Sequence, residues 1–377
     1  METYQTELLA QLKKFRIQKI DPTVLEDEEK EQFRFEIYQE LGQLGYTGMV
    51  LPERFGGAEL SFYDYCLALA ELAKSSVAYA TTISVSTMVQ TLINIYGTEE
   101  QKQKYLPPLC QGKEIASFAL SESSAGSDAA SLKTTAKKVP GGWNLNGTKL
   151  WISSAGLSKT YLVMARTGDA GPKGITAFIV RDGAPGFSYG KKEKKMGLKV
   201  SPTRELIFQN CFVPDNQVLD QVGRGFNLAM EALNRGRITI GAQAIGVSER
   251  AFEEALKYSM GRHQFGKAIF EFQGLQFMLA DMRTELEAAR LLVREAAHQF
   301  DQKKQNILMA SMAKLKATDV AMKITTDAVQ ILGGVGYTAE YPVERLMRDA
   351  KAFQIVEGTN QIQKVVIAKE LQKEMHA

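Results

Sequence analysis

A single carboxylate near the end of the chain has the setting of a catalytic base. Glu357 stands in "QIVEGTNQIQK", between an apolar pair and a run of small and amide side chains. Asn360 and Gln363 have the spacing of an N-cap and its N3 partner, which predicts that the last helix begins near residue 360. Glu357 then lies in the loop that enters this helix, where Gly358 permits a sharp turn. A solvated surface acid is the alternative interpretation.

Two opposing effects are expected on the pKa of Glu357. Ile355 and Val356 indicate apolar surroundings, which raise the pKa of a carboxyl group because they disfavour its charged form. The positive end of the following helix lowers the pKa. A carboxyl group whose pKa is shifted by its surroundings is a candidate for a functional site. Glu357 is therefore the candidate base.

Two further segments could hold an anionic or an aromatic ligand. "FALSESSAGSDAASL", residues 118–132, is rich in Ser and Gly, so backbone amides and hydroxyls could approach an anion closely. A solvated connection is the other interpretation of this loop. Trp151, followed by Ser153 and Ser154, could form the wall of a flat aromatic site, or it is an ordinary core residue.

Basic residues gather at two places in the C-terminal third. Arg235 and Arg237 are two positions apart on a predicted helix, so they point to different faces. At least one of them is expected to be buried or to face a ligand. In "GRHQFGK", Arg262 and Lys267 flank Phe265 at a helix end, which indicates either a phosphate contact or a surface turn.

Other kinds of site are not expected. "GVGYTA", residues 334–339, matches the dinucleotide fingerprint G-x-G-x-x-A, but a helix rather than a strand precedes it. We interpret it as a glycine-rich helix C-terminus. Three cysteines lie far apart without a CxxC pair, which fits a reducing compartment. Three histidines share no ligand spacing, so no metal site is predicted.

The elements that must position these residues follow the order helices, strands, helices. The sequence predicts a helical N-terminal domain at residues 1–114, a middle β domain at 115–222 and a helical bundle at 223–377. This order lacks βαβ alternation, which argues against a doubly wound sheet. The expected fold is mostly α with a β middle domain, and the short strands of that domain indicate a small antiparallel barrel or sandwich.

Local signals predict where individual elements begin and end. The Asn-Gly pair at 146–147 in "GGWNLNGTKLWIS" predicts a hairpin turn. Pro107 and Pro108 are expected to end a helix that begins after Gly97. A second long helix of the bundle is expected to end at Gly333. Apolar residues at alternating steps of three and four predict the first long bundle helix: Phe272, Leu275, Leu279, Met282, Leu286, Ala289, Val293, Ala296 and Phe300.

Composition is that of an ordinary soluble globular protein. The 377 residues allow two or three domains, and 45% apolar and 24% charged residues are usual values. A net charge of +3, with scattered basic residues, gives no reason to expect nucleic acid or an anionic membrane as partner. No apolar run could span a bilayer, and the polar start resembles neither a signal nor a transit peptide. A cytoplasmic location of bacterial type is expected.

Taken in order, the blocks of this chain resemble those of the acyl-CoA dehydrogenases. They include "LSESSAGSDAASL", "LNGTKLWIS", "LNRGRI", "RHQFGKAI", "QILGGVGY" and "RDAKAFQIVEGTNQIQ". The resemblance covers essentially the whole chain and is closest to short-chain and branched short-chain members, such as butyryl-CoA and isobutyryl-CoA dehydrogenases. It implies an N-terminal helical domain, a small antiparallel β-barrel and a C-terminal four-helix bundle. It also implies a homotetramer, a dimer of dimers, with FAD at the interfaces.

The activity implied by this resemblance is α,β-dehydrogenation of an acyl-CoA, in fatty acid β-oxidation or branched-chain amino acid catabolism. Glu357 resembles the base that removes the α-proton while a hydride leaves for flavin N5, and electrons then pass to an electron-transferring flavoprotein. The Glu357 N–H and a ribityl hydroxyl would hold the thioester carbonyl. Two branches of the family carry the base on an earlier helix. The matching position here is Gly236, which closes that alternative.

Other positions match cofactor and substrate contacts of the family. Those that line the isoalloxazine are matched by Phe118, Leu120, Ser121, Trp151, Ile152 and Ser153. Those that hold the ribityl, pyrophosphate and adenosine, partly from a neighbouring subunit, are matched by Arg262, Gln264, Phe265, Gln273, Gln330, Gly333 and Gly334. Flavin contacts are also matched by Thr359 and Gln361. Positions that meet the CoA ester or its binding loop are matched by Ser127, Asn234, Arg237 and Gly358.

The chain departs from the family pattern at a few positions. "SES" replaces Thr-Glu-Pro, so Ser121 keeps a hydroxyl while Ser123 loses a rigid turn. Ser153 stands where Thr is usual. Ala80 stands where glutaryl-CoA dehydrogenases carry an Arg, so a dicarboxylyl substrate is not expected. A flavin-dependent oxidase or monooxygenase on the same scaffold is the alternative function, and Glu357 argues against it. Acyl chain length and branching stay open.

Overall fold

The computed structural model describes residues 2–304 and 306–375, and its elements follow the predicted order. The N-terminal helices are α1 (Glu2–Phe15), α2 (Val24–Lys30), α3 (Phe35–Gln43), α4 (Phe62–Ala73), α5 (Val77–Tyr96) and α6 (Glu99–Cys110). The strands that follow are β1 (Ala116–Ala119), β2 (Thr135–Val139), β3 (Gly142–Ser153), β4 (Thr160–Arg166), β5 (Ile175–Arg181), β6 (Phe187–Lys192), β7 (Thr203–Pro214) and β8 (Val218–Leu219). The C-terminal part holds α7 (Gly225–Gly261), β9 (His263–Gln264), β10 (Lys267–Ala268), α8 (Gln273–Asp301), α9 (Ile307–Leu332), α10 (Val343–Phe353) and α11 (Asn360–Glu374). The predicted class, mostly α with a β middle domain, is confirmed.

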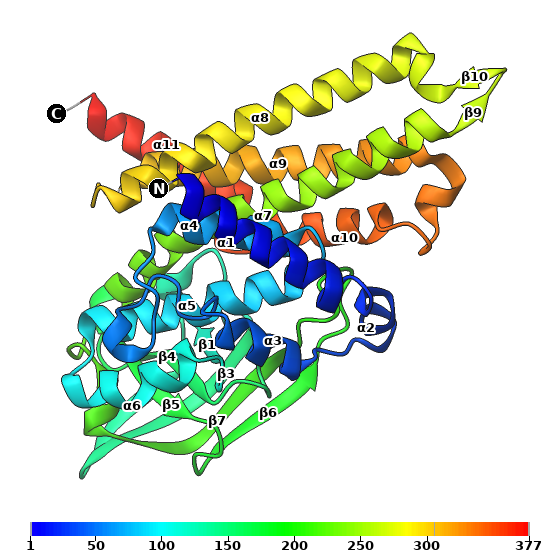
Figure 1. Ribbon diagram of the computed structural model, residues 1–377. Helices are drawn as coiled ribbons and strands as arrows, with labels where there is room; N and C mark the ends of the chain where they lie inside the picture. Colours follow the sequence, from blue (N-terminus) through cyan, green and yellow to red (C-terminus); the bar gives the residue numbers. More distant parts are fainter. Residues whose placement is uncertain (1, 305, 376–377) are drawn as a thin grey trace.

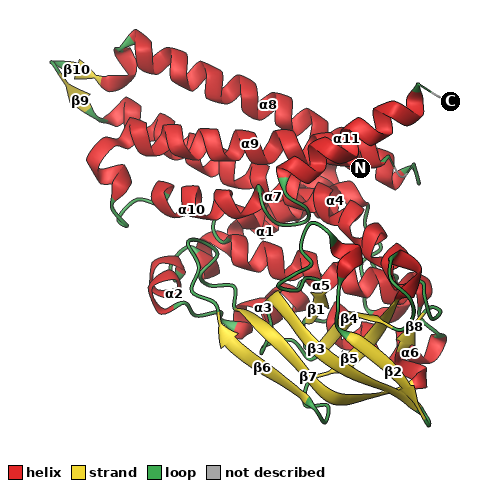
Figure 2. Ribbon diagram, turned by 180° about the vertical axis from the view of Figure 1, so that it is seen from behind, coloured by secondary structure: helices red, strands yellow, loops and turns green. Residues whose placement is uncertain are grey.

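The helical bundle and the β domain form two layers, with N-terminal helices between them. Figure 1 shows α7, α8 and α9 running side by side above the sheet, and Figure 2 shows the sheet from behind. Helix α5 contacts α7 of the bundle and β1 of the sheet. The predicted limits near residues 114 and 222 fall in the connections between α6 and β1 and between β8 and α7. The domain limits themselves stay predictions.

The middle domain is one mixed sheet, which runs in the order β6-β7-β3-β2-β4-β5-β8. Most of its neighbours are antiparallel, as predicted. Strand β1 pairs with β4 in parallel, and β2 meets the end of β4 in parallel. These two parallel pairings were not anticipated from the sequence. They bring the segment after β1 alongside the end of β3.

The Asn-Gly hairpin prediction is wrong. Strand β3 runs straight through Asn146 and Gly147, and its register against β7 shifts between Leu145 and Gly147. Gly147 has φ 144°, and a Cβ at this position would lie 2.7 Å from the Cα of Thr134. The glycine therefore serves a β-bulge and a close backbone approach, both of which exclude a side chain. The real hairpin joins β2 to β3, where Val139 pairs with Gly142.

The predicted helix end at Pro107 and Pro108 is also wrong, because α6 continues to Cys110. The residues one turn earlier, Gln103 and Lys104, are exposed, so water can hydrogen-bond the carbonyl groups that lose their helical N–H donors. Both prolines lie in the last turn. Their carbonyl oxygens find donors just beyond the helix. The N–H of Gln111 donates to Pro107 O at 3.1 Å, and that of Lys113 donates to Pro108 O at 2.9 Å.

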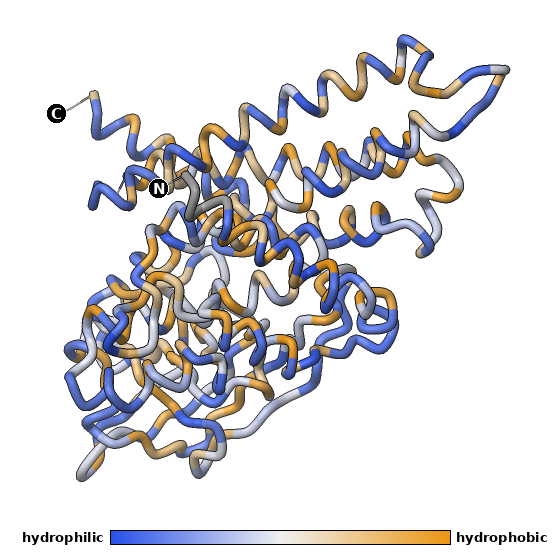
Figure 3. Tube along the Cα trace, in the orientation of Figure 1, coloured by the Kyte–Doolittle hydropathy of each residue, from blue (hydrophilic) through white to orange (hydrophobic). Residues whose placement is uncertain are grey.

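The bundle prediction is confirmed in detail. Helix α8 covers the predicted segment, and its buried positions belong almost entirely to the predicted stripe: Leu279, Met282, Leu286, Ala289, Val293 and Ala296. Figure 3 shows the resulting alternation of hydrophilic and hydrophobic residues along α8. Helix α9 ends at Leu332, and Gly333 follows with φ 65°. The "GVGYTA" segment thus follows a helix, as its interpretation as a helix C-terminus requires.

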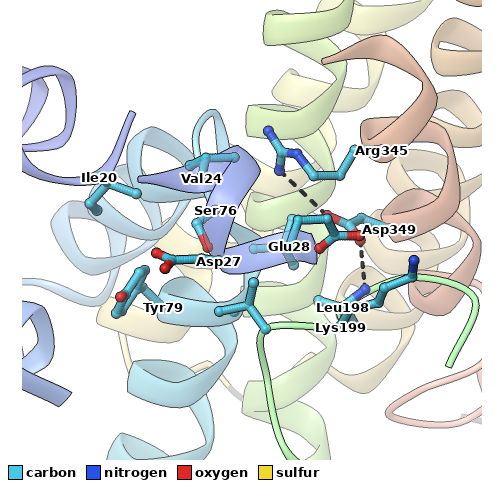
Figure 4. A pocket seen from close by; sticks show the side chains of 13 residues that line it. Ile20, Val24, Asp27, Glu28, Ser76, Tyr79, Leu198, Lys199, Arg345 and Asp349 are labelled. Atoms are coloured by element: carbon cyan, nitrogen blue, oxygen red, sulfur yellow. Dashed lines mark hydrogen bonds and ion pairs between the residues drawn. The ribbon is translucent and has the colours of Figure 1, made fainter. Parts of the chain in front are cut away.

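A buried junction ties the three parts of the chain together (Figure 4). The carboxylate of Asp349 on α10 accepts a hydrogen bond from the N–H of Leu198 at 2.6 Å, and Arg345 Nη1 lies 3.8 Å from it. Burial raises the pKa of Asp349 to about 6, against the opposing effect of Arg345. Arg348 on the same helix donates to Glu28 Oε1 of α2 at 2.6 Å. The junction therefore holds α10, whose end leads into the loop of Glu357.

A buried ion pair holds the Ser- and Gly-rich loop. The Lys149 side chain is fully buried, and its Nζ donates to Leu120 O at 3.0 Å and to Glu122 Oε1 at 2.7 Å. Burial lowers the pKa of Lys149 to about 8, although Glu122 acts in the opposite direction. Glu122 also accepts from the N–H groups of Lys133 and Thr134, at 2.6 and 2.9 Å. The pair of Lys149 and Glu122 thus fixes both ends of this loop.

We predict that Lys149→Met destabilises the protein strongly. The change leaves the carboxylate of Glu122 buried without its cation, which costs about 3–5 kcal/mol in comparable cases. The matched control is Lys138→Met on the neighbouring strand β2. Its ion pair with Asp215 is about half exposed on both sides, and such pairs contribute about 1 kcal/mol or less.

The free energy of unfolding of both variants is measured by urea denaturation. A loss in Lys149→Met no larger than that in Lys138→Met would show that the buried pair is not a structural requirement.

Candidate active site

The loop that carries Glu357 has an unusual backbone. It joins α10 to α11, and both Glu357 (φ 54°) and Gly358 (φ 85°) adopt left-handed conformations. A left-handed conformation is easy for Gly but unfavourable for Glu, and such residues concentrate at functional sites. The N–H of Asn360 donates to Gln354 O at 3.0 Å and closes the loop. The predicted sharp turn before the last helix is therefore present.

The predicted start of the last helix is right, but its predicted capping residue is wrong. Helix α11 begins at Asn360, and the N-cap is Thr359, whose hydroxyl accepts from Ile362 N at 3.3 Å. The side chain of Asn360 is turned toward α9 instead. Its Nδ2 donates to Thr318 Oγ1 at 2.9 Å and to Asp319 Oδ1 at 2.7 Å.

The carboxyl group of Glu357 is buried although the residue as a whole is only half-buried. Its Oε2 is inaccessible and has no hydrogen-bond partner among the described residues. A Cβ built on Gly236 of α7 would lie 2.6 Å from Glu357 Cδ and 3.0 Å from Met88 Cε of α5. Ile355 and Val356 are 55% and 38% exposed, so the expectation that they dry the carboxyl is wrong for the single chain. Helices α5 and α7 enclose it.

Two cations act on this carboxyl group. Burial raises the pKa of Glu357 to about 7, while Arg237 and Lys314 lower it in that order. Arg237 on α7 is 6% exposed, and its Nη1 donates to Asn234 Oδ1 at 2.7 Å. Lys314 on α9 is fully buried. The predicted conflict is thus present, but cationic side chains take the place of the helix terminus.

Lys314 was missed from the sequence, although a signal for it exists. It stands in "MASMAKLKATD", four residues after Ala310 and three before Ala317, both of which are buried. A charged residue on the apolar stripe of a helix is unusual unless it has buried partners. The sequence position of Lys314 therefore indicated buried partners, which the apolar periodicity alone does not reveal.

A cavity of about 250 Å³ reaches the same place. Gly236 lines it, so the cavity adjoins the wall against which the Glu357 carboxyl lies. Helix α5 contributes Ser84, Thr87, Met88 and Thr91. The other lining residues come from the α4 region, from α7 and from the end of α8: Val50, Leu60, Phe62, Tyr65, Arg235, Thr239, Phe300, Asp301 and Lys303. The cavity therefore lies between the N-terminal helices α4 and α5 and the bundle helices α7 and α8.

The two segments predicted to line a flavin ring lie side by side. Leu150 N donates to Ser121 O at 2.9 Å, and Ser117 Oγ donates to Ser153 O at 2.6 Å. Leu120 and Ile152 are buried beside them, and Phe118 is partly buried. Trp151 has φ 57° and is 56% exposed at the end of β3. An open indole flanked by hydroxyl groups fits a planar ring, and the core interpretation of Trp151 is excluded.

The remaining cofactor candidates lie elsewhere. Figures 1 and 2 show the β9–β10 hairpin at the end of the bundle that points away from the sheet. Phe265, at its tip, is 93% exposed and has φ 52°. All residues of this group are exposed: Arg262, Gln264, Phe265, Gln273, Gln330, Gly333 and Gly334. A single chain does not bring them to Trp151.

The other predicted contact residues differ in accessibility. Ser127 and Gln361 are exposed, whereas Asn234, Thr359 and Gly358 are partly buried. The described residues contain no group of three or more His, Cys, Asp or Glu gathered for a metal ion. In the same ranges, no helix is both long and apolar enough to cross a membrane.

Comparison with known proteins places this geometry in a family. Residues 2–113, 117–211 and 223–372 match, respectively, the N-terminal, middle and C-terminal domains of acyl-CoA dehydrogenases. A short-chain specific acyl-CoA dehydrogenase of Megasphaera elsdenii is 46% identical over 93% of this chain and 94% of its own.

Two solved structures are similar over nearly the whole chain. The butyryl-CoA dehydrogenase of Megasphaera elsdenii has a TM-score of 0.96 and 44% identity, covering 98% of both chains. A structure described for the electron transferring flavoprotein of Acidaminococcus fermentans has a TM-score of 0.96 and 45% identity, covering 97% of both. With all three domains matched in order around a buried carboxyl group, the chain belongs to the acyl-CoA dehydrogenase family.

Proposed function

We propose that this chain oxidises a short- or branched-chain acyl-CoA to the trans-2-enoyl-CoA, with Glu357 as the base that removes the α-proton. One observation carries the proposal. Oε2 of Glu357 is inaccessible and has no hydrogen-bond partner among the described residues, the adjacent Gly236 lines a cavity, and burial raises the pKa of Glu357 to about 7. A base whose pKa lies near the working pH is both ionised and strong enough to act.

The loop backbone also suits a thioester. No hydrogen bond within the described residues uses the N–H of Glu357, so it is free to donate to a carbonyl oxygen. Such a donor stabilises the negative charge that develops on this oxygen when the α-proton leaves. Gly358 has no side chain to obstruct the approach of the substrate. Arg237 and Asn234 lie on the neighbouring face of α7, where they could meet the CoA ester.

The residues present fit FAD, which supplies a two-electron acceptor when bound. Trp151, Ser121 and Ser153 would hold its ring. Thr359, which follows Glu357 closely in the sequence, would be a further flavin contact. The exposed group around Phe265 would reach the cofactor of a neighbouring subunit, in the predicted homotetramer. One similar structure is described as a complex of its protein, PigA, with FAD and proline. This likeness supports the cofactor prediction.

Electron-transferring flavoprotein is the proposed acceptor of the electrons. The likeness to the Acidaminococcus fermentans structure supports this partner. The cytoplasmic location stays a prediction, as do the assembly as a dimer of dimers and the role in fatty acid or branched-chain amino acid catabolism. A flavin-dependent oxidase or monooxygenase would need no acyl-CoA, and the position of Glu357 disfavours it.

For the proposed activity, the first prediction concerns the base itself. Glu357→Gln keeps the shape of the side chain, so the protein is expected to remain yellow and FAD-loaded. Its turnover with butyryl-CoA should fall by about three to four orders of magnitude, because the α-proton loses its acceptor. Flavin content is read from absorbance and turnover from bleaching of the flavin.

Glu370→Gln is the matched control, since this acid on α11 pairs with an exposed lysine, Lys373. It should leave turnover unchanged. Near-normal turnover in Glu357→Gln would remove Glu357 from the mechanism.

The second prediction concerns pH. Only the ionised carboxylate accepts a proton, so kcat/KM should rise with pH and level off, with a midpoint near the raised pKa of Glu357, about 7. The profile is measured from pH 5 to 9 with one acyl-CoA. A midpoint near 4.5 would mean that the free carboxyl is solvated and that its burial does not operate in solution.

The third prediction concerns the substrate. Butyryl-CoA or isobutyryl-CoA should bleach the flavin faster than octanoyl-CoA, as the short-chain relatives suggest. The panel also includes 2-methylbutyryl-CoA and isovaleryl-CoA. Fastest bleaching by octanoyl-CoA would overturn the chain-length assignment alone. No bleaching by any of them, together with oxygen consumption in the absence of acyl-CoA, would favour the oxidase alternative.

A further inference from the structure

Lys314 is a buried lysine that no carboxylate neutralises directly. Its side chain is fully buried on α9, and it forms no ion pair within 4 Å among the described residues. Its Nζ instead donates to two neutral oxygens, Gly358 O at 2.9 Å and Asn360 Oδ1 at 2.7 Å. Burying an ammonium group without a counter-ion is unfavourable. A charge kept in such a place therefore requires an explanation.

The first effect of Lys314 is geometric. Gly358 O, its acceptor, belongs to the left-handed pair of residues at 357 and 358. The same oxygen accepts from Gln363 Nε2 at 2.9 Å, and Gln363 Nε2 also reaches Glu357 O at 3.2 Å. Donors from α9 and α11 thus hold both carbonyl groups of the strained turn. Without them, an unfavourable backbone conformation at a glutamate would relax.

The second effect is electrostatic. Lys314 and Arg237 are the cations that act on the Glu357 carboxyl, and Asp319 is the other acid that acts on Lys314. Asp319 is itself occupied, because its Oδ1 accepts from Asn360 Nδ2 and from Gln354 Nε2, both at 2.7 Å. Among the described residues, Asn360 and Gln363 reach the turn from α11 and are neutral, as is Met88 of α5 beside Gly236. Glu357 is therefore the main group that the charge of Lys314 can serve.

We propose that Lys314 is a positioning residue for the dehydrogenation: its ammonium group holds the left-handed turn at 357–358 and supplies positive charge that favours the ionised form of Glu357. The inference rests on the proposed function. The side chain of Lys314 then has two roles, as hydrogen-bond donor and as cation, and different substitutions test them separately. Lys314→Met keeps the length but removes both roles. Lys314→Gln keeps a donor, and Lys314→Arg keeps the charge.

The test is the pH profile of kcat/KM in FAD-loaded protein. Loss of a nearby cation makes ionisation of a carboxyl less favourable. The midpoint of Lys314→Met should therefore move upward by about one pH unit, so that the loss of kcat/KM at pH 6 exceeds that at pH 9 by about tenfold. Lys314→Arg should restore most of the wild-type midpoint, whereas Lys314→Gln should not.

The matched control is Lys316→Met. Lys316 is two residues further along α9, and its ion pair with Glu285 is partly exposed. This variant should keep the wild-type midpoint. Lys314→Met that loses stability or flavin but keeps the wild-type midpoint would overturn the proposal, because a purely structural lysine predicts that result. A midpoint in Lys314→Arg displaced as far as in Lys314→Met would also overturn it.

A second readout needs no turnover. The infrared band of the protonated Glu357 carboxyl is isolated by subtracting the spectrum of the matching Glu357→Gln variant, and it is followed against pH. This band should titrate at higher pH in Lys314→Gln than in wild type, and an unchanged titration would overturn the proposal even if Lys314→Met does not fold. Failure of the proposed function would look different. In that case none of the acyl-CoA compounds would bleach the flavin of the wild-type protein at any pH.

Discussion

Desolvation of the Glu357 carboxyl group is the interaction on which the organisation of this site depends. A buried carboxylate is unfavourable unless something offsets the loss of water, and here hydrogen bonds do not, since Oε2 has no partner among the described residues. Two cations on different helices, Arg237 and Lys314, offset part of it through the electric field. The carboxylate therefore keeps an oxygen atom without a hydrogen-bond donor, and this oxygen can accept a proton.

The distant parts of the fold can be understood as supports for this one group. The junction at Asp349 fixes α10 against α2 and the segment after β6, and α10 delivers the loop of Glu357. The pair of Lys149 and Glu122 fixes the loop after β1, and parallel pairing of β1 with β4 sets that loop beside Trp151. All three domains thus contribute to the relative placement of the base and the flat site, which local sequence could not encode alone.

The sequence predicted those features that depend on periodicity and on local backbone chemistry. The stripe of α8, the turn at Gly358 and the start of α11 follow from such signals. It failed where tertiary contacts chose between local options. Gly147 faces Thr134 across the sheet and so makes a bulge rather than a hairpin. The side chain of Asn360 is hydrogen-bonded to Thr318 on α9, so Thr359 caps α11 instead. Lys314 escaped notice because its partners lie more than forty residues away.

The close approach of the Glu357 carboxyl group to Gly236 has a consequence for how such enzymes can diversify. A side chain there would occupy the volume in which the Glu357 carboxyl lies. Acids at both positions would bring two like charges into one dry pocket, where only one could ionise. The base can therefore lie on the loop, at position 357, or on the helix, at position 236, but not at both. Moving the base from the loop to the helix therefore requires at least two coupled substitutions. The intermediate with one substitution has either two side chains in the same volume or no base.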